Sequence, residues 1–540
     1  MPVSAPHTRN PQPATRNSAG AVEVRRLRQA AWLSVAAGTA LWVARWASFP
    51  LSLDPYYHLF VAEQVRAAGG PIAYEWWAYA PVGRAHLYPP LLHLLLAFVR
   101  SVGLPGLTVL RLASALIVPA VHVNLYLASR RLFGERIALG CVWAALVPFS
   151  FSAHAAITMA ASLGLIELLW LLVALREGRT LASGVLFGLL WYTHLGMPWV
   201  ALVTAAAWAA MERKVRRPVS GLLLGLAAGL PWLIHLAGHR SFVRVVPRQE
   251  NEALELSVAV FVLAAIGLSF VIWQIWQKRA RDPSGRPVVA MLLGFSLLAW
   301  RFSFRWLSGE GLAPLIVLSG FGLCASGEWA ARGRSWRWQL GGMALATALA
   351  VCCPTITVAP AGVRWVWRDA APFHLLGAAT RELPFDVSLS SGGHGERVAR
   401  AVAQMTQPGD ILWSNAPYAL GMVAALAQRP MSSAMFYEVG PREPFDPIRA
   451  ARMIVWFRLP EGPEVPAREA VIRRYGLVPE GEDPVAELWR NPNAAATARR
   501  PEAALSMAGA GMLLCLALFG LVWGFRGRVD HEERIASVNG

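Results

Sequence analysis

The sequence predicts a polytopic α-helical membrane protein that carries a small α/β domain outside the membrane. Its 540 residues are 55% hydrophobic and only 15% charged, and the mean hydropathy is +0.41. A water-soluble domain with this balance would expose far more apolar surface than water tolerates. About twelve apolar runs approach or reach the length that crosses roughly 30 Å of hydrocarbon as a helix: 30–49, 107–128, 137–153, 155–175, 180–195, 197–211, 218–236, 255–277, 287–306, 311–327, 338–353 and 503–524.

The arginines and lysines predict the orientation of these helices. Short basic loops stay in the cytoplasm during membrane insertion. We therefore expect a multi-pass protein of the plasma (inner) membrane with both termini cytoplasmic. The formal charge of +17 is mostly this topology signal, so nucleic-acid binding is not expected. The basic clusters lie at 25–28, 130–136, 176–179, 213–217, 278–286, 332–337 and 526–528.

The same reasoning divides the chain into domains. Residues 1–29 are polar and read as a disordered cytoplasmic tail. Residues 30–354 form the transmembrane domain, in which 50–106 is the first external loop. Residues 355–502 are predicted to form the external domain, and 503–540 the last transmembrane helix with a cytoplasmic tail.

Within 355–502, charged residues and prolines return and the pattern becomes that of a soluble domain. Residues 410–414 and 452–457 are short apolar runs typical of buried strands. Residues 395–407 and 467–475 favour helices. Alternating strands and helices predict a small α/β domain of ordinary size.

The first external loop holds the densest group of chemically active side chains. It contains Asp54-Pro55-Tyr56-Tyr57-His58 and, about thirty residues on, Gly83-Arg84-Ala85-His86-Leu87-Tyr88-Pro89-Pro90. A carboxylate, histidines, aromatic rings and an arginine together suit a polar, anionic substrate carried by a lipid. We therefore expect His58, Arg84, His86 and Tyr88 to contact a substrate.

Each of these residues also has a structural interpretation. Asp54 before a proline is typical of a turn or helix cap, but a carboxylate here could also accept a proton or bind a cation. His58 lies one helical turn further on, so both would face one cavity if the segment is helical; otherwise His58 is an interfacial polar residue. Tyr88 fits an aromatic belt or a sugar-stacking surface. Arg84 lies outside against the charge bias, which favours a phosphate or diphosphate partner.

These motifs, with Pro81-Val82-Gly83-Arg84, resemble the first external loop of the GT-C membrane glycosyltransferases, and among them the archaeal and bacterial catalytic subunits of oligosaccharyltransferase. The resemblance implies a GT-C-like fold, with Asp54 as the catalytic carboxylate. It also implies a sugar donor linked to polyprenyl phosphate or diphosphate, and inversion at the anomeric carbon.

Two further segments fall where that family has functional residues. Arg301 and Arg305 lie at the external end of a predicted span and resemble the family's arginine near the lipid phosphate; the alternative is that they snorkel to the interface. Glu250 and Glu252 lie in an external loop comparable to one in which the family has a functional glutamate. An exposed charge run is the alternative for this loop.

One departure from the family concerns a metal. Where the family has a second acidic motif, the chain has His154 and no carboxylate. Asp54 and His154 are then the candidate ligands. Because Mg²⁺ and Mn²⁺ prefer oxygen ligands, we expect weak or absent dependence on a divalent cation.

Another departure concerns the acceptor. The family's soluble domain carries a Trp-Trp-Asp motif, whereas the corresponding stretch here reads Gly409-Asp410-Ile411-Leu412-Trp413-Ser414-Asn415. Recognition of an Asn-X-Ser/Thr peptide is therefore not supported, and the acceptor stays open among a glycan, a lipid and a protein.

The sequence thus predicts a membrane glycosyltransferase whose partners are a polyprenyl-linked donor, an acceptor and membrane lipids. A transporter or flippase of lipid-linked saccharides is the alternative, but it would need polar residues at mid-membrane, and few occur besides Glu167 and His194. A non-catalytic anchor for the external domain would need neither a dozen spans nor the cluster in loop 50–106.

Overall fold

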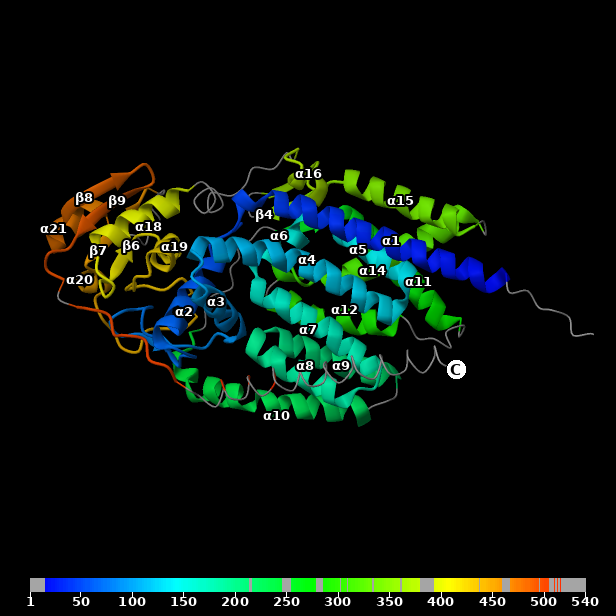
Figure 1. Ribbon diagram of the computed structural model, residues 1–540, viewed down its shortest axis with the longest axis horizontal. Coiled ribbons are helices and arrows are strands. Elements are labelled where there is room, and N and C mark those ends of the chain that lie inside the picture. The colour runs from blue at the N-terminus through cyan, green and yellow to red at the C-terminus, as the bar shows by residue number, and fades with distance from the viewer. Residues whose placement is uncertain are drawn as a thin grey trace, which may run out of the picture.

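The protein is a long helical bundle with an α/β domain at one end, and the start of the first helix lies at the opposite end (Figure 1). The computed structural model describes residues 15–212, 216–244, 254–277, 285–301, 303–307, 309–332, 335–359, 362–378, 393–436, 438–458, 467–494 and 496–504, with residues 509, 512 and 515.

The bundle is built from helices that follow the apolar runs of the sequence. Five stretches of the described chain are long and apolar enough to cross a membrane: α4, α7, most of α10, α11, and residues 305–331. Shorter apolar helices fill other predicted spans, so the total of twelve stays a prediction. The helices are α1 (Thr15–Ala44), α4 (Gly106–Phe133), α5 (Glu135–Ala145), α6 (Phe149–Ile157), α7 (Met159–Arg176), α8 (Thr180–Thr193), α9 (Met197–Glu212), α10 (Arg216–Gly238), α11 (Val258–Trp276), α12 (Arg286–Arg301), α13 (Ser303–Leu307), α14 (Leu312–Ala331) and α15 (Trp336–Cys352).

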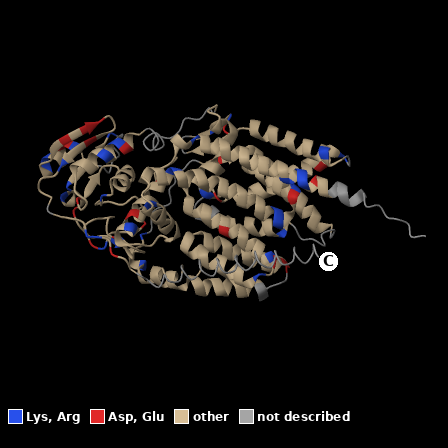
Figure 2. Ribbon diagram, in the orientation of Figure 1, with Lys and Arg blue, Asp and Glu red and all other residues tan. Residues whose placement is uncertain are grey.

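Charged residues gather toward the two ends of the bundle and on the α/β domain, while the middle of the helices holds few of them (Figure 2). This is the distribution expected when the middle of the bundle lies in hydrocarbon. The fold is therefore that of a multi-pass membrane protein.

Close helix contacts depend on glycine at one crossing. Helix α11 packs on α14, and a Cβ on Gly267 or Gly322 would overlap the backbone of the facing helix. Small residues let backbones approach where apolar burial gives little driving force between helices in lipid.

The predicted single span at 137–153 is wrong, because the structure breaks it into α5 and α6. Helix α5 ends at Ala145, and α6 begins at Phe149, directly after Pro148. Proline lacks the backbone N–H and disfavours helical geometry in the residue before it. The break brings the C-terminal end of α6 to the cavity described below.

The expectation that residues 1–29 are disordered is also wrong for the described residues from Thr15 onward, which belong to α1. Leu27, Ala31 and Val35 are spaced four apart and are buried against α4 and α5. The apolar stripe of the helix therefore begins inside the polar segment, where overall polarity conceals it.

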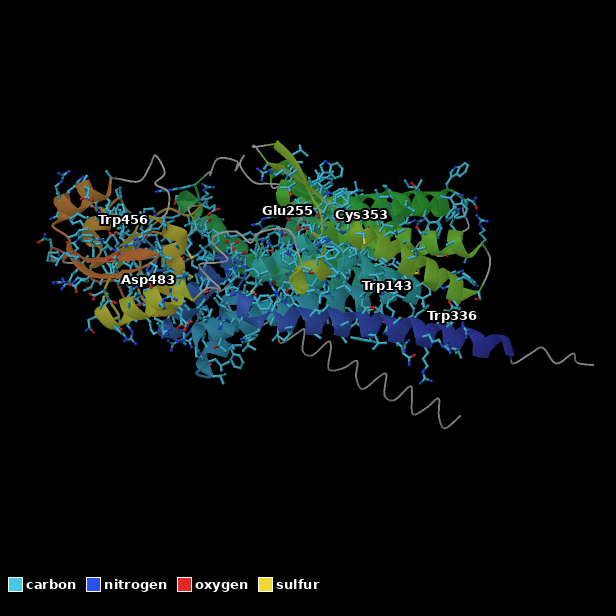
Figure 3. All side chains as sticks on the ribbon, turned by 90° about the horizontal axis from the view of Figure 1, so that it is seen from above. Trp143, Glu255, Trp336, Cys353, Trp456 and Asp483 are labelled. Atoms are coloured by element: carbon cyan, nitrogen blue, oxygen red, sulfur yellow. The ribbon has the colours of Figure 1, made fainter. Side chains whose placement is uncertain are left out.

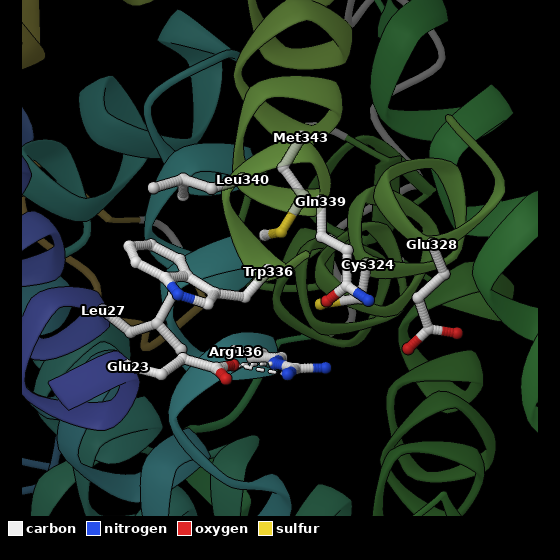
Figure 4. A pocket seen from close by; sticks show the side chains of 9 residues that line it. All are labelled: Glu23, Leu27, Arg136, Cys324, Glu328, Trp336, Gln339, Leu340 and Met343. Carbon is white, nitrogen blue, oxygen red and sulfur yellow. Dashed lines mark hydrogen bonds and ion pairs between the residues drawn. The ribbon is translucent and has the colours of Figure 1, made fainter. Parts of the chain in front are cut away.

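Two ion pairs hold the N-terminal half of α1 against α5. Arg28 Nη2 lies 3.0 Å from Glu135 Oε1, and Glu23 pairs with Arg136 (Figure 4). Glu23 and Arg136 border a cavity of about 10 Å³ beside Trp336, which has room for a single water.

Residues 50–106, the predicted first external loop, fold into two helices joined by a hairpin. They are α2 (Asp54–Ala68) and α3 (Leu91–Ser101), and the hairpin pairs β1 (Tyr74–Glu75) with β2 (Arg84–Ala85). The loop is compact because α2 packs on both α3 and a helix of the α/β domain, α19 (Pro417–Ala427).

The α/β domain confirms the strands and helices expected at 410–414, 452–457, 395–407 and 467–475. Its sheet has the order β6-β7-β9-β8, parallel between β6 and β7 and antiparallel elsewhere. The elements are α18 (His394–Met405), β6 (Leu412–Ser414), α19 (Pro417–Ala427), α20 (Pro447–Ala450), β7 (Met453–Phe457), α21 (Arg468–Tyr475), β8 (Val478–Asp483) and β9 (Ala486–Arg490).

Residues 355–378 do not belong to this sheet. Strands β4 (Thr355–Ala359) and β5 (Gly362–Val366) pair with β3 (Leu254–Ser257) in a separate antiparallel sheet, and α16 (Ala371–Leu375) follows. The sheet lies at the end of the bundle nearest the α/β domain (Figure 1). It joins the residues before α11 to those after α15.

Candidate active site

A cavity of about 500 Å³ lies where residues 50–106, the bundle and the α/β domain meet. Its size is in the range of small-molecule sites. Its walls are apolar at Leu87, Ile157, Leu195, Leu236, Val243 and Val439. Its charged or titratable side chains include Asp54, His58, Glu75, Arg84, His194 and Arg305.

Asp54 and His58 reach the cavity from the first turns of α2. The helix begins at Asp54, with Pro55 in its first turn, where a fixed φ suits a helix start. Residues four apart share a helix face, and both Asp54 and His58 line the cavity, as expected from their spacing. Asp54 also lies where the helix dipole favours a carboxylate.

Glu75 and Arg84 form the most buried ion pair at the cavity wall. They lie directly opposite each other in the β1–β2 hairpin, and Arg84 Nη2 is 2.7 Å from Glu75 Oε2. The other oxygen, Oε1, accepts a hydrogen bond from Tyr57 at 3.0 Å and contacts His86 Nδ1 at 2.9 Å. Arg84 also donates to the carbonyl of Phe436 at 2.6 Å. The charge of Arg84 is therefore compensated by protein groups.

This arrangement fixes the charge state of Glu75. Burial alone would raise its pKa, but Arg84 and the hydrogen bond with His86 outweigh burial and lower the pKa of Glu75 to about 2. Burial opposes the charge of Arg84 in turn, yet Glu75 raises its pKa. Both groups stay charged at neutral pH.

A hydrogen bond between two buried histidines sets the tautomer of His58. Its Nδ1 lies 3.0 Å from His93 Nε2, and His93 Nδ1 is buried without a hydrogen-bond partner. A bare buried acceptor is tolerated better than a buried N–H without a partner. His93 therefore carries its proton on Nε2 and donates it, which leaves the proton of neutral His58 on Nε2. His58 is then a hydrogen-bond donor at the cavity.

Two buried histidines predict that the protein loses stability in acid. Burial lowers the pKa of His58 to about 3, and it lowers the pKa of His93 well below its usual value. Unfolded histidines titrate near pH 6.5, so between about pH 6.5 and 3 the unfolded state binds more protons. The free energy of unfolding should fall as pH decreases through this window, by about 1.4 kcal/mol per pH unit for each histidine. Thermal unfolding in detergent from about pH 7.5 to 4.5 measures it. A flat profile over this range would contradict the buried neutral state.

Arg305 brings a second guanidinium to the cavity from α13. Its Nη1 lies 3.7 Å from Glu310 Oε1, too long for a hydrogen bond. Arg305 also acts on Tyr88: burial raises the pKa of Tyr88, and Arg305 opposes this while Asp54 adds to it. Tyr88 therefore keeps its hydroxyl proton within the field of both Asp54 and Arg305.

The α/β domain completes the cavity with residues 436–439. Val439 forms an antiparallel bridge with Val243, and Arg244 N donates to the Glu438 carbonyl at 2.7 Å. Phe436 packs edge-on against Tyr57 at 4.6 Å between ring centroids. Phe436 and Glu438 therefore bound the site from the side of the α/β domain.

His154 does not line the cavity. Its Nδ1 lies 3.0 Å from the Ser150 carbonyl, while Ile157 and Thr158, one turn further on, reach the cavity wall. Within the described ranges, no group of three or more histidine, cysteine, aspartate or glutamate side chains is arranged to hold a metal. A site made of Asp54 and His154 stays a prediction.

The structure thus brings the predicted catalytic residue, Asp54, together with four of the predicted substrate residues. One cavity is lined by Asp54 and by His58, Arg84, Tyr88 and Arg305. His86 lies behind this cavity and contacts Glu75. The Arg301 side chain, Glu250 and Glu252 lie outside the described part of the chain. Sequence reasoning missed Tyr57, Glu75, His194 and Glu438 as cavity residues.

Comparison by sequence finds no protein-family model that matches the chain and no characterised protein related to it. Comparison by structure does find similar proteins. ArnT from Cupriavidus metallidurans, in the apo state, superposes with a TM-score of 0.56 over 86% of this chain and 98% of its own, at 15% identity.

The archaeal oligosaccharyltransferase AglB from Archaeoglobus fulgidus is also similar. Its complex with an inhibitory peptide and a dolichol-phosphate gives a TM-score of 0.52 at 12% identity, over 79% of this chain and 69% of its own. Its complex with Zn and sulfate gives 0.52 at 11% identity, over 78% and 68%. Identities this low establish the fold alone, and they confirm the fold that the first external loop predicted: the chain has the GT-C fold.

Proposed function

We propose that the protein is a membrane glycosyltransferase that moves a sugar from a polyprenyl phosphate or diphosphate to an acceptor on the external face. The proposed orientation in the membrane has the cavity and the α/β domain on the external face and both termini in the cytoplasm. AglB, a protein of the same fold, was crystallised with a dolichol-phosphate, which supports a lipid-linked donor for this chain.

The observation that carries the proposal is the meeting of Asp54 and Arg305 in one cavity. The carboxylate comes from the first external loop, and the guanidinium from a short helix at the end of the bundle. A guanidinium suits a phosphate, and a carboxylate suits the hydroxyl or amide that attacks the sugar. The pair supplies both ends of a displacement reaction.

The proposed step is a direct displacement at the anomeric carbon. The bond from this carbon to the phosphate oxygen breaks, and a bond to the acceptor nucleophile forms. The acceptor proton passes to Asp54, and the leaving phosphate keeps the electron pair next to Arg305. His58 and Tyr88 would donate hydrogen bonds to the sugar or phosphate. Arg84, already paired with Glu75, would hold the hairpin and residue 436 in place.

The acceptor is proposed by class only. A peptide bound to AglB makes a protein acceptor plausible for the fold, yet the sequence motif that reads such peptides is missing here. A glycan, a lipid or a protein side chain all fit a cavity that opens between the bundle and the α/β domain.

Lipid analysis tests the proposed function. Cells that lack the protein should accumulate a polyprenyl-linked saccharide, seen by mass spectrometry of extracted lipids. Adding back the purified protein with membranes should consume that lipid and release polyprenyl phosphate or diphosphate. Unchanged lipid profiles together with no consumption in vitro would rule the proposal out. Repeating the assay with a chelator tests the expected weak dependence on a divalent cation.

Replacing Arg305 should separate a phosphate ligand from a structural arginine. We expect Arg305→Ala to lower kcat/KM by roughly 10²-fold, because a charged donor to the leaving phosphate is lost. The control is Arg397→Ala, an exposed arginine of the α/β domain paired with Asp483. Equal activity of both variants would remove Arg305 from the mechanism.

A further inference from the structure

The sheet of β3, β4 and β5 has one apolar and one polar face. In its antiparallel register Leu254 lies opposite Val358, which lies opposite Val363; Leu256, Ile356 and Trp365 form the next row. The alternate positions carry Glu255, Thr357 and Arg364 in one row, and Ser257, Thr355 and Val366 in the other. Side chains directly opposite share a face. All six residues of one face are therefore apolar.

Among the residues that the structure describes, none covers the apolar face. Val363 and Trp365 on the outer strand are 62% and 58% exposed, and the other four side chains of the face are only half-buried. Within the same described residues, none of the six packs against the hydrophobic cores of the bundle or of the α/β domain. An uncovered apolar face of three strands marks a surface that meets another apolar phase.

The position of the sheet identifies that phase. Ser257 is the residue directly before helix α11, and β4 begins two residues after Cys353, the C-cap of α15. The backbone N–H of Val258, the first residue of α11, donates to the Pro354 carbonyl at 3.4 Å, and Figure 3 labels Glu255 in the sheet and Cys353 beside the end of α15. The outward sides of both helices are apolar and exposed, at Val262, Ile266, Leu345 and Leu349. The apolar face therefore adjoins the lipid-facing surface of the bundle.

The dimensions place the sheet in the interface and not across the bilayer. Its strands have four or five residues, about 17 Å at most, whereas the hydrocarbon core is about 30 Å thick. Tryptophan is favoured at headgroup depth. Arg364 and Arg368, on either side of Trp365 in the sequence, suit lipid phosphates.

We propose that this sheet is an interfacial membrane anchor, with Val363 and Trp365 inserted at the level of the headgroups and Arg364 on the opposite face of the outer strand turned toward water. Helix α13 lies against β3, so the anchor also sets the depth of Arg305. This last consequence rests on the proposed function, whereas the anchoring itself does not.

Single cysteines on alternate residues of β5 test the anchor. Val363→Cys places a probe on the apolar face and keeps Trp365. Trp365→Cys places a second probe on the same face. Arg364→Cys places the probe on the opposite face. Each is made in the full chain with its five native cysteines replaced, labelled with an environment-sensitive fluorophore, and reconstituted in vesicles of phosphatidylethanolamine and phosphatidylglycerol.

Nitroxide-labelled lipids should quench the probes at 363 and 365 roughly threefold more than the probe at 364, since the inserted face of an interfacial element lies about 5–10 Å into the boundary region. Soluble iodide should give the reverse order. Equal lipid quenching at all three positions would overturn the anchor. If the probes at 363 and 365 are protected from both quenchers, a second protein surface and not lipid covers the apolar face. If iodide quenches both probes strongly, the face meets water. Either result would overturn the anchor. None of these readouts depends on catalysis, so failure of the anchor and failure of the proposed function are distinguishable.

Discussion

Asp54→Asn should lower transfer by roughly 10²-fold or more while the protein still inserts and folds. The substitution keeps the size of the side chain and much of its hydrogen bonding but removes the proton-accepting charge. The measurement compares initial rates of purified variants in liposomes. Lipid extracted from cells that lack the protein serves as the donor.

The structural interpretation of Asp54 gives a different result. A carboxylate that only favours the start of α2 would contribute about 0.3–1 kcal/mol to stability through the helix dipole and nothing to turnover. Asp410→Asn is the matched control, since Asp410 accepts a local backbone hydrogen bond in the α/β domain, away from the cavity. Near wild-type transfer by Asp54→Asn, with a small fall in melting temperature, would end the case for a catalytic carboxylate.

Glu75→Gln should destabilise the protein by about 3–5 kcal/mol, because it leaves the Arg84 guanidinium buried without its counter-charge. Arg84 is only 2% exposed and cannot turn to water. Tyr57 and His86 would lose a charged acceptor at the same time. The measurement is the free energy or midpoint of unfolding in detergent at neutral pH.

The control for this variant is an exposed pair. Glu396→Gln breaks the pair with Arg400, where both side chains are solvent-exposed, and should change stability by less than about 1 kcal/mol. A double variant, Glu75→Gln with Arg84→Met, should recover part of the loss, because it removes the stranded charge. A Glu75→Gln protein as stable as the control would mean that water reaches Arg84.

The part of the site that the sequence predicts is the part with local spacing. Asp54 and His58 are four residues apart, so a helical segment must bring them to one side. Sequence reasoning missed Glu75 because its strand has only two residues, too few to show the alternation of apolar and polar residues that marks a strand. Its partner Arg84 stood out as an external charge against the topology bias, although Glu75, which compensates that charge across the hairpin, lies only nine residues away.

The contributions of distant segments could not be read from the sequence. Phe436 and Glu438 reach the cavity through backbone pairing with residues 242–244, which has no local signature. Strand β3 was absorbed into the predicted span at 255–277, because an apolar strand that runs into an apolar helix shows no boundary in hydropathy. Pro148 was visible, yet its break lay inside a continuous apolar run.

The hydrogen bond from Arg84 to the Phe436 carbonyl spans 352 residues of sequence, and Ala80 and Met431 are joined across a similar separation. During biosynthesis the segments that carry Asp54 and Arg305 are made well before residue 436 leaves the ribosome. In the proposed topology, the nascent chain then holds both charged groups beside an open gap until the last quarter of the protein crosses the bilayer and docks. A product that ends before residue 430 would insert but lack the outer wall of its cavity. The hairpin charges that are buried in the full protein would be exposed in such a fragment, where cellular quality control could recognise them.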